Sequence, residues 1–384
     1  MIDSHCSHES SGSLMWFIGG QGLVSNDHLT GIGCTRRLVM VRTASGWLLC
    51  FMKFLAASLF ASLAFLPILA QAREVRVYSG RHYNTDRQSY KAFTETTGIK
   101  VRLIEASGIS LVERLKREGS NTKADVIILV DAARINNAAK AGLFQPIASS
   151  KLRSEVPSQY RDPSNQWFGL TRRVRAIVVN PNVVNPAKVQ TYAQLASSDL
   201  KGKLCLRNRK NVYNQSLVAD QLALKGEAAT KAWLKGVTAN VTQPYFTGDI
   251  GLIRAVAQGK CGVGVVNHYY LARMLSGVNG GKDEQLARKV SIVMPNPAHV
   301  NISAAAVSRY AQNKEEAIQL IEFLASPNGS AGLAGPTYEF PLQGVGSSTY
   351  LKGMTKFTPD GVTISQLSSF NPLAIRLMAQ AGWQ

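Results

Sequence analysis

The stretch WFGLTRRVRAIVVNP, residues 167–181, decides the fold of this chain. It begins with apolar residues, passes through a basic segment and ends in the apolar run 176–179. Strand and helix patterns alternate on both sides of it, so we predict a long strand that passes from one α/β lobe into a second. The apolar run 302–307 is a second candidate for such a crossing.

The part before this stretch has a βαβαβα order. The expected helices are bounded by Gly98, Gly119 and Gly142, which act as stop signals. This order predicts a mostly parallel sheet with helices on both faces. The predicted strands are 75–78, 100–106 and 125–130, and the predicted helices are 86–97, 111–117 and 132–141.

Further α/β units follow the stretch, and the chain shows no internal repeat. Two α/β lobes joined by two crossing strands describe a two-lobed, hinged binding protein with its ligand in the cleft between the lobes. We expect an N-lobe of 73–174 plus about 300–348 and a C-lobe of 175–299 plus about 349–384. The predicted elements here are strands 203–206 and 262–266 and helices 215–224, 227–235 and 314–324.

The N-terminal region resembles an export signal. Residues 52–72 contain a short basic start at Lys53, the apolar run 54–70 and the small-residue cleavage site Ala70-Gln71-Ala72, which predicts a signal peptide and a periplasmic protein. We expect residues 1–51, which lack a sustained period, to come from a misplaced start and to be absent from the mature protein. The alternative is an uncleaved anchor over about 47–70, long enough to span a bilayer.

Cleavage of the signal peptide would leave two cysteines in the mature protein. Of five cysteines, Cys205 and Cys261 are the two that lie beyond residue 72. Two cysteines in an exported chain most simply form one disulfide, and the alternative is two free buried thiols.

The chain is basic, with a formal net charge of +19. The charges are spread out, and the tight runs are 172–175 and 207–210. No nucleic-acid-binding pattern appears, so we expect a solvated basic surface and no nucleic-acid partner. We also expect a monomer that does not insert stably into a membrane after signal cleavage. The sequence has no nucleophile elbow, zinc-protease helix or phosphate loop, so we do not expect an enzyme.

Tyrosines provide the candidate binding chemistry. Tyr269 and Tyr270 are adjacent, Tyr83 follows His82, and Tyr213 stands apart. At a strand end or a helix start two neighbouring side chains can turn toward one point, and together these segments offer up to four phenolate oxygens and one imidazole. Such hard oxygen donors suit Fe(III). The alternative is that the tyrosine pair is an ordinary amphipathic feature of a domain surface.

Four segments of the chain resemble a known family. They are 77–86, 168–173, 212–219 and 267–270. They resemble the periplasmic ferric-iron-binding protein of bacterial iron ABC transporters, in the cyanobacterial Fut-type branch of the transferrin-like solute-binding proteins. The resemblance extends from Val75 to the C-terminus. Gly80 departs from the serine frequent before Arg-His-Tyr in this branch, which should affect only the turn geometry.

The resemblance implies Fe(III) as the transported ligand and a permease of an iron ABC transporter as the partner. His82 would be a possible fifth ligand, and Arg173 would lie close to the metal without binding it. We expect the rest of 172–175 to be solvated and His268 to point away from the site or toward the backbone. The alternative on the same fold is a binding protein for an organic solute such as a polyamine, thiamine or a phosphonate. The implied metal ligands are Tyr83, Tyr213, Tyr269 and Tyr270.

Overall fold

The computed structural model describes residues 73–384 except 82 and 243. The predictions for the upstream segment 1–51, the signal peptide 52–72 and the alternative anchor 47–70 lie outside the described residues. Within the part of the chain that is described, no helix combines the length and apolarity needed to cross a bilayer.

The first half folds as predicted, with parallel strands connected by helices. Strand β1 (Glu74–Ser79) pairs in parallel with β2 (Lys100–Glu105) on one side and β3 (Val126–Val130) on the other. Helix α2 ends at Gly98, whose φ of 73° is readily adopted by a residue without Cβ. The connecting helices are α2 (Asp86–Thr97), α3 (Gly108–Glu118) and α4 (Ala132–Lys140).

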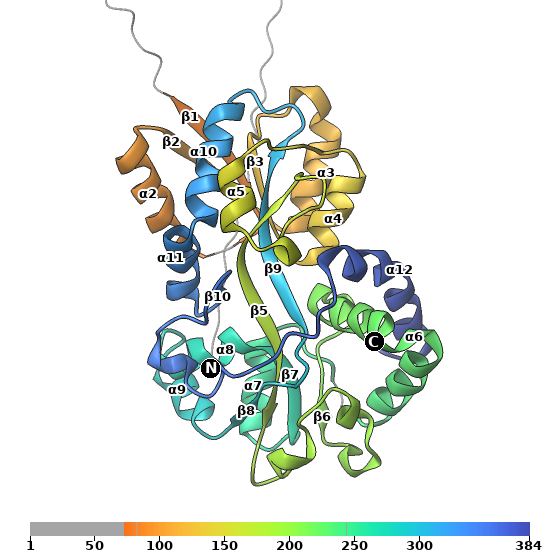
Figure 1. The fold of residues 1–384 in the computed structure, drawn as a ribbon. Helices are drawn as coiled ribbons and strands as arrows, with labels where there is room; N and C mark the ends of the chain where they lie inside the picture. Colours follow the sequence, from red (N-terminus) through yellow and green to blue (C-terminus); the bar gives the residue numbers. More distant parts are fainter. Residues whose placement is uncertain (1–72, 82, 243) are drawn as a thin grey trace, which may run out of the picture. The chain divides into compact units, whose positions relative to one another are not determined.

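The predicted crossing strands are β5 (Phe168–Val179) and β9 (Val300–Ser308). They lie side by side along the middle of Figure 1. Strand β5 pairs with β9 as far as Val174, and from Arg175 onward it pairs with β7 (Val263–Asn267). One continuous strand therefore belongs to the sheet of the first half and to that of the second.

The parallel arrangement predicted for the part before the crossing stretch is found in β1, β2 and β3, whereas most other strand pairs of the sheet are antiparallel. Parallel pairing within the described sheet is confined to β1 with its two neighbours and to β6 (Leu204–Cys205) with β7. The pairs β3–β9, β9–β5 and β5–β7 are antiparallel. The reason is the path of the chain, which leaves the first half along β5 and returns along β9 in the opposite direction.

The second half is built around a long helical segment, α6 (Val212–Ala239). Its backbone is non-helical at Gly226 (φ 77°, ψ 176°), which separates the two helices predicted there. The other helices and strands are α5 (Ser150–Glu155), α7 (Asp249–Ala257), α8 (His268–Leu275), α9 (Gly281–Ala287), α10 (Lys314–Ala325), α11 (Pro327–Thr337), α12 (Ile364–Gln380), β4 (Phe144–Gln145), β8 (Ser291–Val293) and β10 (Phe340–Pro341).

Two buried apolar clusters hold these elements together. The larger one contains the strands β1, β3 and β9 and the helices against them. The other surrounds α6, where Leu217 and Val218 pack with Leu377 and Met378 of α12. The C-terminal helix is therefore part of the core of the second half, as Figure 1 shows by its position beside α6.

The predicted disulfide between Cys205 and Cys261 is present, with Cα atoms 5.9 Å apart. It joins β6 to the residues just before β7, and both cysteines are buried. The bridge therefore ties the edge strand β6 to the segment that leads into its neighbour β7.

Candidate metal centre

The structure brings together tyrosines from both halves of the chain. Tyr83 lies in the loop between β1 and α2, and Tyr269 lies at the start of α8. Their rings are 6.4 Å apart at 87°, and the rings of Tyr269 and Tyr270 are 4.3 Å apart. Tyr213, in the first turn of α6, is close enough for its charge to act on the other phenols. His82 lies outside the described residues.

Two helix starts explain how these side chains converge. Tyr269 and Tyr270 are the second and third residues of α8, so their side chains turn toward one side rather than to opposite faces as on a strand. Tyr213 is the second residue of α6. The amino-terminal end of a helix carries partial positive charge, which favours a phenolate there. Of the two settings that the sequence left open for the tyrosine pair, a strand end and a helix start, the structure has the helix start.

The phenols resist ionisation in the absence of a cation. Burial raises the pKa of Tyr269 well above its usual range, and the charges of Tyr213, Tyr270 and Tyr83 add to this effect. Burial, Glu339 and Tyr270 likewise raise the pKa of Tyr83. Each phenolate thus raises the pKa of the neighbouring phenols. A highly charged cation bound among them would lower these pKa values and allow the phenols to ionise.

Arg173 on β5 supplies a positive charge next to the cluster. Its side chain is 2 % exposed, and its guanidinium lies 5.0 Å from the centre of the Tyr213 ring. Burial opposes its charge, but Tyr213, Tyr269 and Asp131 raise the pKa of Arg173 above its ordinary value. Its three nitrogens have no hydrogen-bond partner among the described residues, and Asp131 is 4.0 Å away. A buried guanidinium without hydrogen-bond partners is costly, so this group suits a site that gains negative charge.

Arg175 corrects one expectation, because it is buried rather than solvated. It donates hydrogen bonds to Asn214 at 2.6 Å, Asp249 at 3.0 Å and Asn267 at 3.1 Å. These acceptors lie at the starts of α6, α7 and α8. The guanidinium of Arg175 is planar and has five N–H donors, so it can bond to side chains from all three helix starts. Arg175 therefore positions the helix ends that carry three of the four tyrosines.

A second buried network supports Tyr83. Arg81, at the end of β1, donates to Glu339 at 2.7 Å and to Asp86 at 2.7 Å. The same guanidinium donates to Thr171 on β5 and lies 5.2 Å from the centre of the Tyr83 ring. Sequence reasoning missed this network because Arg81 and Glu339 are 258 residues apart. Glu339 has no local motif that would have marked it.

His268 turns toward the backbone of β5, one of the two orientations expected for it, and its ring lies 5.9 Å from that of Tyr269. Its Nδ1 accepts a hydrogen bond from the Val174 amide at 3.2 Å, and its ring stacks on Phe340 at 4.0 Å. Burial lowers the pKa of His268 to about 3. The residue therefore braces α8 against β5 and β10 as a neutral imidazole.

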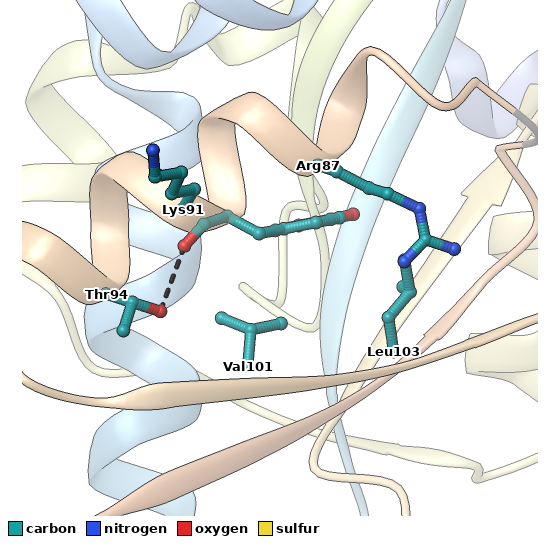
Figure 2. Close-up of a pocket in the computed structure, with 6 residues that line it drawn as sticks. Arg87, Lys91, Thr94, Val101 and Leu103 are labelled. Atoms are coloured by element: carbon teal, nitrogen blue, oxygen red, sulfur yellow. Dashed lines mark hydrogen bonds between the residues drawn. The ribbon is translucent and has the colours of Figure 1, made fainter.

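A pocket of about 200 Å³ lies elsewhere, between α2 and β2. Figure 2 shows Arg87 and Lys91 at its edge and Thr94 donating to the Tyr90 carbonyl. None of its lining residues belongs to the tyrosine cluster. This depression is distinct from the candidate metal centre.

Comparison with known proteins identifies the family to which the chain belongs. The model of the bacterial extracellular solute-binding protein family matches residues 80–331. The chain belongs to this family. The chain is 39 % identical to iron uptake protein A1 of Synechocystis over 82 % of this chain and 88 % of that protein. It is 30 % identical to the major ferric iron-binding protein of Neisseria meningitidis serogroup B, over 85 % of this chain and 97 % of that protein.

A solved structure agrees with these relatives. The Trichodesmium protein named IdiA or FutA, solved with iron and citrate, is 40 % identical, has a TM-score of 0.77 and covers 81 % of this chain and 100 % of its own. The resemblance inferred from the sequence and the two-lobed α/β fold are thereby confirmed. Proteins of this family bind solutes and serve ABC transporters.

Proposed function

We propose that this protein binds one ferric ion between its two lobes and delivers it to the permease of an iron ABC transporter. One observation carries the proposal: Tyr83 of the first half lies against Tyr269 of the second, and the buried guanidinium of Arg173 beside Tyr213 has no hydrogen-bond partner among the described residues. The ligands are Tyr83, Tyr213, Tyr269 and Tyr270, with His82 as a possible fifth. Arg173 stays beside the metal as a counter-charge.

The charges of this set favour Fe(III). Four phenolates around an ion of charge three leave an excess of one negative charge. Arg173 offsets that charge and does not compete for the metal, because arginine keeps its proton. Hard anionic oxygens bind a highly charged cation better than a softer or less charged one. Reduction or protonation of the site then provides a route for iron release.

The position of the ligands links iron binding to lobe closure. Tyr83 comes from the first half of the chain, and the other three tyrosines come from the second. An open form offers an incomplete ligand set, so iron stabilises the closed form by its higher affinity for it. The closed, loaded form is the one that the permease recognises.

We also propose how the protein is processed, where it acts and in which oligomeric state. The precursor starts at Met52 and is cut after Ala72, and the mature periplasmic protein is a monomer without enzymatic activity. Its lobes are 73–174 plus about 300–348 and 175–299 plus about 349–384. Intact-mass analysis of the exported protein should find Arg73 as the first residue, and retention of residues before Met52 would contradict this processing. Light scattering should give the mass of one chain.

The test of function is a titration of the purified, iron-free mature protein with ferric citrate. A visible charge-transfer band from phenolate to iron should grow and level off at one ion per chain. Ferrous iron under reducing conditions should bind more weakly. A colourless protein that binds spermidine or thiamine and ignores ferric iron would support the organic-solute alternative, which rests on the shared fold alone.

A further inference from the structure

A second cluster of potential metal ligands lies away from the tyrosines. Asp220 belongs to α6, His299 immediately precedes β9, and Asp360 lies in the segment before α12. One ligand atom of each residue lies within 4.8 Å of the others. Asp220 and His299 are buried, with 0 % and 1 % of their side chains exposed.

Several atoms of this cluster have no hydrogen-bond partner. His299 Nδ1 lies 3.2 Å from an oxygen of Asp220, and the Gln221 amide donates to the other oxygen at 3.0 Å. Among the described residues, His299 Nε2, Asp360 Oδ2 and Gln221 Oε1 are buried and unpaired. Buried polar atoms are normally paired. An excess of oxygen and nitrogen acceptors with few donors points to a missing cation.

We propose that Asp220, His299 and Asp360 form a second metal site, which takes a divalent cation of the zinc class. Imidazole and carboxylate are ligands that such ions accept. Two zinc ligands at about 2.0–2.1 Å in a tetrahedral arrangement lie about 3.4 Å apart. The 3.2 Å between His299 Nδ1 and the Asp220 oxygen matches one edge of that polyhedron. Gln221 or a water completes the coordination.

The site is accessible and carries excess negative charge. Asp360 lines a cavity of about 180 Å³ together with Tyr160, Val300 and Val362, which gives a route from solvent. The carboxyl groups of Asp220 and Asp360 each have an oxygen within 4.8 Å of the other. A divalent cation relieves the repulsion between the two carboxyl groups.

The cation would tie together three segments at the hinge. The amide of His299 donates to the Tyr192 hydroxyl, which in turn donates to the carbonyl of Arg175 on β5. Residues 298 and 359 form a bridge beside the cluster. Both crossing strands, helix α6 and the chain leading to α12 therefore meet here. The site acts as a structural brace of the hinge, separate from the transported iron.

The test uses the mature Tyr269→Phe/Tyr270→Phe protein, in which zinc cannot use the paired phenols. Zinc is titrated against a chromogenic chelator. One equivalent should bind, and Asp360→Asn and His299→Gln should each lower the affinity at least about tenfold, since losing even an outer partner of a metal ligand costs 10–100-fold. The matched control is Asp199→Asn, an exposed carboxylate paired with Lys188, which should leave zinc affinity unchanged.

Circular dichroism before titration checks that each variant is folded. X-ray absorption of the zinc-loaded protein should show one imidazole with oxygen ligands and no sulfur. Failure of the tyrosine double variant to bind zinc would overturn the proposal. Equal zinc affinity in the folded Asp360→Asn variant and its parent would also overturn it. The colour of the iron-loaded parent is measured separately, so the two proposals fail independently.

Discussion

Replacing Glu339 by glutamine should destabilise the protein by removing one partner of a buried ion pair. Glu339 is 2 % exposed and the Arg81 side chain is fully buried, with 2.7 Å between their charged atoms. Breaking such a pair typically costs about 3–5 kcal/mol. Asp86 remains bound to Arg81, so we expect the lower end, about 3 kcal/mol of unfolding free energy.

The loss should depend on pH in a defined direction. Burial opposes the ionisation of Glu339, but Arg81 and Arg173 outweigh it and hold its pKa below the ordinary value. Stability from this carboxylate is therefore present at neutral pH and lost as pH falls through the folded-state pKa. The difference between parent and Glu339→Gln should stay constant from neutral pH down to about pH 4.3, the ordinary pKa of a glutamate, and should shrink as the pH falls further.

Urea denaturation at several pH values measures this difference. The control is Glu316→Gln, which breaks the more exposed pair with Arg73 and should cost at most about 1 kcal/mol. A Glu339→Gln variant as stable as the control at neutral pH would refute the reasoning. A loss that does not change with pH would show that packing, and not charge, accounts for it.

Two further predictions concern the second half of the chain. Arg175→Met should lower the free energy of unfolding by about 3 kcal/mol in urea melts, because Asp249 loses a buried partner, and unchanged stability would contradict this. Reducing the Cys205–Cys261 bridge, or replacing both cysteines by serine, should cost about 4 kcal/mol for a loop of 56 residues. Two free thiols in the unreduced, denatured protein would refute the bridge itself.

Local patterns predicted much of the fold. The helix predicted at 86–97, with Gly98 as its stop, occurs with the same limits, and the helices predicted at about 215–224 and 227–235 form the two parts of α6 on either side of Gly226. These features depend on neighbouring residues and on the conformational freedom of glycine. The antiparallel pairing of the two crossing strands was not predicted, because strand polarity depends on how the chain returns, which local periodicity does not contain.

The candidate site was predicted only in part. The four tyrosines were selected from the sequence because two of them are adjacent and because phenolate oxygen is a hard donor that suits Fe(III). Arg175 was assigned to solvent because a basic run normally faces water, whereas here three helix starts provide buried acceptors. The Asp220–His299–Asp360 cluster and the Arg81–Glu339 pair join residues far apart in sequence, so only the folded chain brings them together.

The most direct measurement is ferric binding by the Tyr269→Phe/Tyr270→Phe variant. Phenylalanine keeps the ring and removes the oxygen, so the fold should persist. We predict loss of the visible band and a loss of ferric affinity greater than about a hundredfold, because two direct ligands disappear. The control, Tyr310→Phe/Tyr350→Phe, changes two exposed tyrosines and should keep both colour and affinity. Unchanged colour and affinity in the Tyr269→Phe/Tyr270→Phe variant would contradict the tyrosine site.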